Sequence, residues 1–316
     1  MFQRLSRFLV PILAVLVLLA GVSLNAQLSQ GVSNQPYRID VYLVNVLCSV
    51  FDKNTKSFVT ALSQNDFSIF EDGKKQEITN FTRETDLPLT LAVLVDTSNS
   101  VAPKLQFLQD AAISFFSNVL KENDRAMLVE FNSSVNLLQD FTSDPNKLAN
   151  QVRKLRAGGN SSLFDAIDAS CDQKMIRETG RKAMVIISDG DDSGSSVDYR
   201  QAVEMALRAE CTIFSVSVSR GGFFGTSDDT KKGDKILQNL AKETGGKVFF
   251  PFKVEELEDA FHQINQELRS QYSIGYVSTN PRRDGSYRKL DIRVRERNMD
   301  LNHRKGYYAP SNTLTP

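Results

Sequence analysis

The chain switches twice between two patterns of hydrophobic and polar positions. Up to about residue 86, short stretches rich in β-branched and aromatic residues alternate with turn sequences such as EDGK at residues 71–74, which predicts strands joined by turns. From residue 87 to residue 270, continuous apolar runs alternate with segments whose apolar positions recur every three or four residues. This alternation predicts a mainly parallel sheet with helices on both faces. After residue 270 the strand pattern returns.

The two β segments, residues 37–86 and 271–310, are each too small to bury a core alone. Together they suffice for a small β-sandwich-like domain. We therefore expect a doubly wound α/β domain at residues 87–270, inserted into a β domain that is built from both ends of the chain. Two independent hairpins lying on the α/β domain are the alternative.

Two segments give further expectations. Charged residues at 287–297 alternate with Leu290, Ile292 and Val294, which predicts a half-buried strand at the edge of a sheet, with its charges guarding that edge. The glycine- and aspartate-rich residues 221–234 predict an exposed loop.

Residues 1–26 have the layout of a secretory signal peptide. Arg4 and Arg7 precede the uncharged apolar run 8–22, and Ala26 is a suitable last residue before cleavage. The run is short for a membrane span of about 20 residues. We therefore expect a secreted or periplasmic protein with no membrane span after cleavage, and a retained anchor at residues 8–24 is the alternative.

Composition narrows the function classes. Lys and Arg together number 38, as do Asp and Glu, and a formal net charge of zero argues against nucleic-acid binding through bulk electrostatics. The three cysteines, Cys48, Cys171 and Cys211, lack the paired spacing of a zinc site and are too few for a disulfide scaffold, so we expect buried thiols. Two histidines leave little room for histidine-based catalysis.

Three polar loops follow or precede predicted elements at one end of the sheet. Asp96, Ser98 and Ser100 come directly after the first buried strand, GGNSS at residues 158–162 precedes a helix, and SDGDD at residues 188–192 follows another buried strand. Ligands of open α/β sheets bind beyond the carboxyl ends of the strands, so we expect these loops to meet. Such an all-oxygen set suits Mg²⁺, Mn²⁺ or Ca²⁺ and not zinc or copper.

Each loop also has a structural interpretation. Ser98 and Ser100 could cap the following helix, and Asp96 could accept hydrogen bonds from loop N–H groups. Asp191 and Asp192 are interpreted as a solvated turn and not as further ligands.

The three motifs, in this order on this strand and helix pattern, resemble the metal-ion-dependent adhesion site of von Willebrand factor A domains. The resemblance covers residues 87–270 and implies a Rossmann-like fold, and the flanking segments resemble bacterial secreted "VWFA-related" proteins. It implies a divalent cation, Mg²⁺ first with Mn²⁺ or Ca²⁺ as alternatives, and a partner protein whose Asp or Glu carboxylate completes the coordination. The implied metal ligands are Asp96, Ser98, Ser100, Ser161 in place of the family's usual threonine (with Ser162 as its alternative), and Asp189.

The expected function is therefore a protein-binding module of the cell envelope or exterior, with no catalytic residue. One alternative is a structural or assembly protein of the envelope whose metal site is vestigial. Another is a magnesium-dependent phosphotransfer enzyme, since an aspartate follows the first strand. The second aspartate expected two residues later in such enzymes is Ser98 here.

Overall fold

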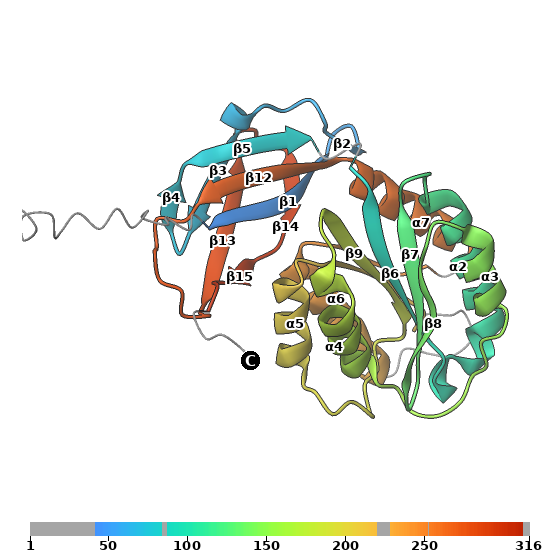
Figure 1. Cartoon of the computed structure of the whole chain (residues 1–316). Coiled ribbons are helices and arrows are strands. Elements are labelled where there is room, and N and C mark those ends of the chain that lie inside the picture. Colours follow the sequence, from blue (N-terminus) through green and yellow to red (C-terminus); the bar gives the residue numbers. More distant parts are fainter. Residues whose placement is uncertain (1–41, 84–86, 220–227, 252, 312–316) are drawn as a thin grey trace, which may run out of the picture. The chain divides into compact units, whose positions relative to one another are not determined.

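A computed structural model describes residues 42–83, 87–219, 228–251 and 253–311 (Figure 1). The predicted signal peptide, residues 1–26, lies outside this range. None of the helices within the described ranges combines the length and the apolar composition that crossing a membrane requires.

The central sheet has six strands in the order β11-β10-β9-β6-β7-β8, and only β8 runs antiparallel to its neighbour. β6 and β9 are buried along their whole length, as their continuous apolar runs indicate. The predicted α/β class and the mainly parallel sheet are confirmed. The strands are β6 (Leu89–Asp96), β7 (Arg125–Phe131), β8 (Val135–Thr142), β9 (Arg181–Ser188), β10 (Thr212–Ser217) and β11 (Val248–Phe249).

Helices cover both faces of this sheet (Figure 1). One face shares a core with α2 (Leu105–Val119), α3 (Pro145–Val152) and α7 (Val254–Arg269). The opposite face packs on α4 (Leu163–Gln173), α5 (Tyr199–Arg208) and α6 (Asp228–Thr244). Two short 3-10 helices, η2 (Asn99–Lys104) and η3 (Met175–Arg177), join these elements.

The prediction of an exposed loop at residues 221–234 is wrong for residues 228–234. α6 already begins at Asp228, and Asp234 within it is buried and accepts hydrogen bonds from Ser217 and Ser219. A buried carboxylate with two hydroxyl donors holds this turn of the helix against β10, which the local sequence alone does not reveal. Residues 221–227 lie outside the described part of the chain.

The remaining strands form two antiparallel sheets, ordered β14-β1-β12-β5 (with β2 paired to β1) and β15-β13-β3-β4. Side chains from both sheets share one core, which includes Val46, Ile69, Tyr272 and Ile292. The strands are β1 (Leu43–Asp52), β2 (Ser57–Phe58), β3 (Phe67–Glu71), β4 (Lys74–Gln76), β5 (Ile78–Arg83), β12 (Gln271–Val277), β13 (Tyr287–Val294), β14 (Met299–His303) and β15 (Gly306–Tyr308), with the 3-10 helix η1 (Gln64–Asp66) before β3.

Strands from the two ends of the described chain pair directly. β1 lies between β12 and β14, and β3 pairs with β13, so in Figure 1 the blue β1 has orange and red neighbours and the cyan β3 pairs with an orange strand. This pairing excludes two independent hairpins. That the two sheets constitute a separate β domain stays a prediction.

The edge position expected for residues 287–297 is wrong. β13 lies inside its sheet, between β15 and β3. The alternation itself is correct, with Leu290 and Ile292 buried, but Arg288 shares their face and is buried too.

The three cysteines are buried and unpaired, as expected. Cys48 lies in the core of the two antiparallel sheets, whereas Cys171 and Cys211 belong to the core beneath α4 and α5.

Candidate functional site

The candidate site lies where two neighbouring strands of the central sheet end. β6 and β9 run side by side, with Val95 opposite Ile187, and the chain continues from them to helices on opposite faces of the sheet. Such a point of divergence leaves an opening beyond the carboxyl ends of the strands, which is where open α/β sheets bind ligands. The side chains of Asp96, at the end of β6, and Asp189, after β9, belong to this edge.

Asp96 is fully buried and its two carboxylate oxygens are held differently. Oδ1 accepts a hydrogen bond from the backbone N–H of Ser98 at 2.8 Å. Oδ2 accepts from the hydroxyl of Ser188 at 2.6 Å and from that of Ser161 at 3.4 Å. The carboxylate is thus fixed by short polar groups from all three loops, and no ion pair between described residues includes it.

Ser98 and Ser100 bring their hydroxyl oxygens to 3.0 Å from each other. Ser98 is buried and immediately precedes η2, but its hydroxyl makes no capping hydrogen bond to that helix. The capping interpretation is therefore not supported for Ser98. From the structural interpretation of the first loop, only the hydrogen bond from a loop N–H group to Asp96 is present.

In the second loop, residues 158–162, the hydroxyls of Ser161 and Ser162 point in different directions. The Ser161 hydroxyl faces Asp96, whereas the Ser162 hydroxyl faces Gly194, since a Cβ at that glycine would lie 2.8 Å from it. Both serines are buried. Of the two, Ser161 thus offers its oxygen to the carboxylate at the end of β6.

Backbone hydrogen bonds tie the three loops together. The N–H of Gly158 donates to the carbonyl of Thr97 at 2.7 Å, and the N–H of Asn99 donates to the carbonyl of Gly159 at 3.0 Å. Gly159 has a φ of 82°, which lets the loop turn there. The N–H of Gly194 donates to the carbonyl of Ser161 at 2.8 Å. The loops that carry these side chains are therefore joined to one another by main-chain hydrogen bonds.

Asp189 is half-buried and hydrogen-bonds to none of the other four candidate ligands; its Oδ1 accepts from the backbone N–H of Asp191 at 3.1 Å. Its charge nevertheless acts on Asp96. Burial raises the pKa of Asp96 to about 6, the hydrogen bonds from Ser188 and Ser98 oppose this rise, and the negative charge of Asp189 adds to it. A cation beside Asp96 would offset both the burial and the negative field of Asp189.

The donor set fits a hard divalent cation. The five candidate residues offer carboxylate and hydroxyl oxygens, with neither nitrogen nor sulfur among them, and such ligands suit Mg²⁺, Mn²⁺ and Ca²⁺. Within the described ranges, no group of three or more His, Cys, Asp or Glu side chains gathers in a metal-binding arrangement. Three of the five donors here are serines, so binding of a cation by these residues stays a prediction.

Two residues of the edge were missed by the sequence analysis. Ser188 donates to Asp96 and accepts from the N–H of Gly190 at 2.9 Å, so it links the first loop to the third. Its position opposite the end of β6 was the available signal. Asp192, interpreted as part of a solvated turn, accepts from the N–H of Phe164 at 3.1 Å and so caps the start of α4 from a distant loop.

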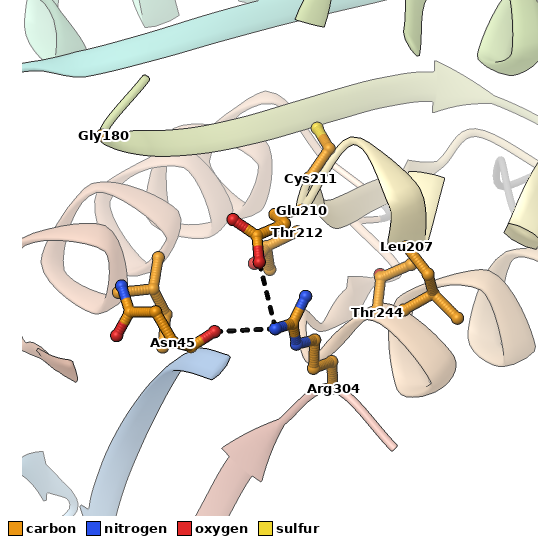
Figure 2. Close-up of a pocket in the computed structure, with 9 residues that line it drawn as sticks. Asn45, Gly180, Leu207, Glu210, Cys211, Thr212, Thr244 and Arg304 are labelled. Atoms are coloured by element: carbon orange, nitrogen blue, oxygen red, sulfur yellow. Dashed lines mark hydrogen bonds and ion pairs between the residues drawn. The ribbon is translucent and has the colours of Figure 1, made fainter. Parts of the chain in front are cut away.

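Two other polar assemblies differ from this edge. Figure 2 shows a small cavity of about 30 Å³ beside Arg304, whose guanidinium donates to the carbonyl of Asn45 at 2.7 Å and to Glu210 at 3.2 Å. A cavity of this size has room for about one water molecule. It gathers no set of reactive groups.

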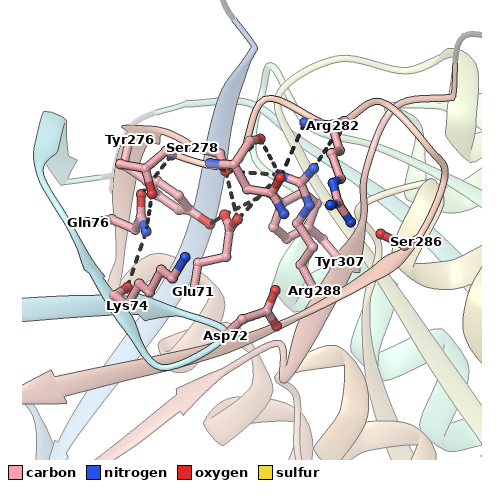
Figure 3. A network of polar contacts seen from close by, with 12 residues as sticks. Glu71, Asp72, Lys74, Gln76, Tyr276, Ser278, Arg282, Ser286, Arg288 and Tyr307 are labelled. Carbon is pink, nitrogen blue, oxygen red and sulfur yellow. Dashed lines mark hydrogen bonds and ion pairs between the residues drawn. The ribbon is translucent and has the colours of Figure 1, made fainter.

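Figure 3 shows the other assembly, which surrounds the buried Glu71. Its carboxylate accepts from the hydroxyls of Tyr276 and Ser278, each at 2.7 Å, from Tyr307 at 2.9 Å and from the guanidinium of Arg288 at 3.3 Å. This carboxylate is neutralised by the chain itself, which is the arrangement of a structural ion pair.

Comparison with known proteins identifies one family. The profile of the von Willebrand factor type A domain matches residues 90–267, more than half of the chain. No curated protein matches the sequence.

Several solved structures are similar. An aerotolerance-related membrane protein from Bacteroides fragilis is 18% identical, with 57% of this chain and 98% of that chain covered and a TM-score of 0.46. The conserved hypothetical protein BatB from Bacteroides thetaiotaomicron is 16% identical, with coverages of 57% and 97% and a TM-score of 0.46. A von Willebrand factor type A protein from Catenulispora acidiphila is 10% identical, with coverages of 88% and 76% and a TM-score of 0.48.

Proposed function

Since the chain belongs to the von Willebrand factor type A domain family, we propose that it binds a partner protein through a divalent cation at the edge of its central sheet. The cation is Mg²⁺ first, with Mn²⁺ or Ca²⁺ as alternatives. When bound, it would supply a positive charge that attracts an anion, and an Asp or Glu carboxylate of the partner would complete its coordination. The residues that would hold it are Asp96, Ser98, Ser100, Ser161 and Asp189.

The observation that carries the proposal is the state of Asp96. Its carboxylate is fully buried, receives only neutral donors, and lies in the negative field of Asp189. Burying an anion without a cationic partner is costly. This cost supports the proposal that an external cation binds at this edge of the sheet.

The chain's own residues have distinct roles in the proposal. Asp96 is the fixed anionic ligand, and Ser188 and the N–H of Ser98 hold its orientation. The hydroxyls of Ser98, Ser100 and Ser161 are neutral ligands. The backbone bonds between the loops hold these oxygens in place before any ligand arrives, which reduces the ordering cost of binding. No residue is proposed to be catalytic.

Calorimetric titration of the chain from Gln27 with Mg²⁺, Mn²⁺ and Ca²⁺ tests the proposal. We expect one site in the parent, no binding by Asp96→Ala, and binding weakened by about tenfold or more in Ser161→Ala. Ser162→Ala is the matched control, one residue away and equally buried, and should bind as the parent does. Binding by a folded Asp96→Ala, or equal losses in the two serine variants, contradicts the proposed ligand set; absence of binding by the parent favours the assembly role.

We propose that the mature protein acts outside the cytoplasm, in the periplasm or beyond the cell. The support is the sequence of residues 1–26, which lie outside the described structure. Mass spectrometry of the mature chain is expected to find Gln27 at its N-terminus, and recovery of residues 8–24 would show an anchor instead.

We also propose that the two antiparallel sheets form one β-sandwich-like domain into which the von Willebrand factor type A domain is inserted. The shared core and the pairing of β1 with β12 and of β3 with β13 support this. Native-state hydrogen exchange should then show the amides of these strands opening together, at a free energy different from that of β6 and β9. A single opening energy for all of them would contradict two domains.

A further inference from the structure

A wide groove lies beside the outer end of β1, away from the candidate metal site. It has a volume of about 780 Å³, within the range of about 300–1,000 Å³ typical of ligand pockets. Phe51 of β1, Phe58 of β2 and the residues of α7 near Ser270 line it, together with Lys53, Lys56 and Lys247. Lys247 precedes β11, and therefore lies at the opposite end of the parallel strands from Asp96 and Asp189.

A second cavity lies on the other side of Lys247. This cavity has a volume of about 220 Å³ and shares Lys247 with the first, while Lys242 and Lys305 line its other parts. Five lysines thus line the two neighbouring hollows. Charges of one sign that line a hollow raise the local concentration of oppositely charged ligands.

Most of this positive charge is not neutralised within the described part of the chain. Lys53 pairs with Asp300 at 2.7 Å, but Lys56, Lys242, Lys247 and Lys305 take part in no ion pair between described residues.

The carboxylates near the other lysines are engaged elsewhere or lie too far away for a pair. Glu267, which lies near Lys247, is buried and accepts from Ser49 at 2.7 Å and from Asn302 at 2.8 Å. Burial and the charge of Lys242 lower the pKa of Lys305, and the charges of Glu243 and Asp291 only partly oppose this. An anion in the hollow would therefore meet cations that lack a partner.

The groove also has an apolar part. The rings of Phe51 and Phe58 form an edge-to-face pair with centroids 5.4 Å apart, and both side chains are half-exposed. The Nζ of Lys247 lies 5.9 Å from the centre of the Phe51 ring. Charged and aromatic groups are thus presented side by side, a combination that suits a ligand carrying both negative charge and apolar side chains.

We propose that this basic groove is a second binding site, which takes an acidic polypeptide segment with at least one aromatic or large aliphatic residue. The peptide's carboxylates pair with Lys56, Lys247 and the lysines of the adjoining cavity, and its apolar side chain packs on Phe51 and Phe58. A peptide is favoured over a sulfated polysaccharide because the phenyl rings offer contact area that a uniformly polar chain does not use. The site needs no divalent cation, so it is independent of the edge that contains Asp96.

Fluorescence anisotropy with a labelled peptide of Glu, Asp and Gly that carries a single Phe tests this site, with EDTA present to exclude the metal site. We expect binding that weakens with salt, and a loss of about tenfold for each of Lys56→Glu and Lys247→Glu. Lys147→Glu on α3 is the matched control, since it makes the same charge change on an exposed surface outside both cavities. Lys147→Glu and Asp96→Ala should bind as the parent does.

Three results would overturn the proposal. The first is no binding of the peptide by the parent at concentrations up to about 1 mM. The second is an equal loss in Lys147→Glu, which would mean that net charge and not the groove attracts the peptide. The third is tighter binding of a sulfated polysaccharide than of the peptide. A peptide with Ala in place of Phe should bind the parent several-fold more weakly than the Phe peptide does. The Phe58→Ala variant should bind the two peptides equally.

Discussion

Two buried carboxylates of this chain, Glu71 and Asp96, differ in whether a cationic side chain accompanies them. Glu71 is 2% exposed, and Arg288 together with three hydroxyls saturates it (Figure 3). Asp96 is 0% exposed and also accepts from two hydroxyls, but its remaining donor is a backbone N–H and not a guanidinium. The difference is the positive charge that accompanies the first carboxylate and is missing beside the second.

This difference separates a structural carboxylate from a candidate binding one. A buried ion pair whose lone pairs are all used has nothing left to offer a ligand, and its loss is felt in stability. A buried carboxylate without a cation costs the fold stability, which a bound cation would restore. Both carboxylates are buried and both accept several hydrogen bonds, so neither property alone marks a functional carboxylate.

Removing the guanidinium of Arg288 from the saturated carboxylate of Glu71 should have the largest effect on stability. Arg288→Met leaves the buried carboxyl group of Glu71 without its cationic partner, and we expect the free energy of unfolding to fall by about 3–5 kcal/mol. Urea unfolding followed by circular dichroism measures this. Arg288→Lys keeps the charge and should lose less, which provides a folded variant if Arg288→Met does not fold; a loss below about 1 kcal/mol in Arg288→Met would remove the contrast with Asp96.

His303 supplies a third kind of buried titratable group, one that the fold keeps neutral. Its Nδ1 lies 2.7 Å from the carbonyl of Arg304, and its Nε2 accepts from the N–H of Ile292 at 3.4 Å, an arrangement that needs the neutral ring with its proton on Nδ1. Burial, helped by the charge of Lys305, lowers the pKa of His303 to about 4. The stability that this group contributes is therefore complete above about pH 6.5 and is lost as the pH falls towards 4.

The expected size of this loss is about 3 kcal/mol between pH 7 and pH 4. His303→Gln does not titrate, so the difference in unfolding free energy between the parent and this variant should change by that amount over the same interval. Urea unfolding at several pH values measures it, and a difference that is independent of pH would show that His303 is not held neutral by the fold.

Binding of a cation at the unsaturated carboxylate of Asp96 should have the smallest effect on stability. Mg²⁺ at ten times its dissociation constant should raise the unfolding free energy of the parent by about 1.4 kcal/mol. Asp96→Asn keeps the shape of the side chain but removes its charge, so without cation it should be at least as stable as the parent, and Mg²⁺ should not stabilise it. Thermal unfolding with and without Mg²⁺ measures both, and equal stabilisation of the two proteins would place the cation elsewhere.

Much of the fold and the neighbourhood of the candidate site could be predicted because their signals are local. The apolar runs that become β6 and β9 are buried on both faces, and Asp96 and Asp189 follow them directly. Once the sheet is parallel, the ends of its strands must meet at one edge. Local order along the chain therefore sufficed to bring Asp96, Ser98 and Ser161 together.

What could not be predicted depends on partners far away in the sequence. Arg288 occupies an inward position of β13, and a charged residue there makes sense only beside Glu71, which is 217 positions earlier. Likewise Asp192 looks like a solvated turn residue until the start of α4 lies beside it. In both cases the side chain's environment is created by tertiary packing, which a pattern of neighbouring residues does not contain.

The pairing of the first described strand with the last ones has a consequence for the order of folding in time. During synthesis, β1 emerges long before β12 and β14, its neighbours in the sheet, and Ser49 must wait for Glu267, 218 positions later. Contacts of such sequence separation form slowly, whereas the central sheet can assemble from segments closer together.

We expect pulse-labelled hydrogen exchange during refolding to protect β6 and β9 before β1 and β12, and the reverse order would refute this. A nascent chain would then carry β1 without its sheet neighbours for much of its synthesis, and the export proposed above would meet this unpaired strand before the two antiparallel sheets are complete.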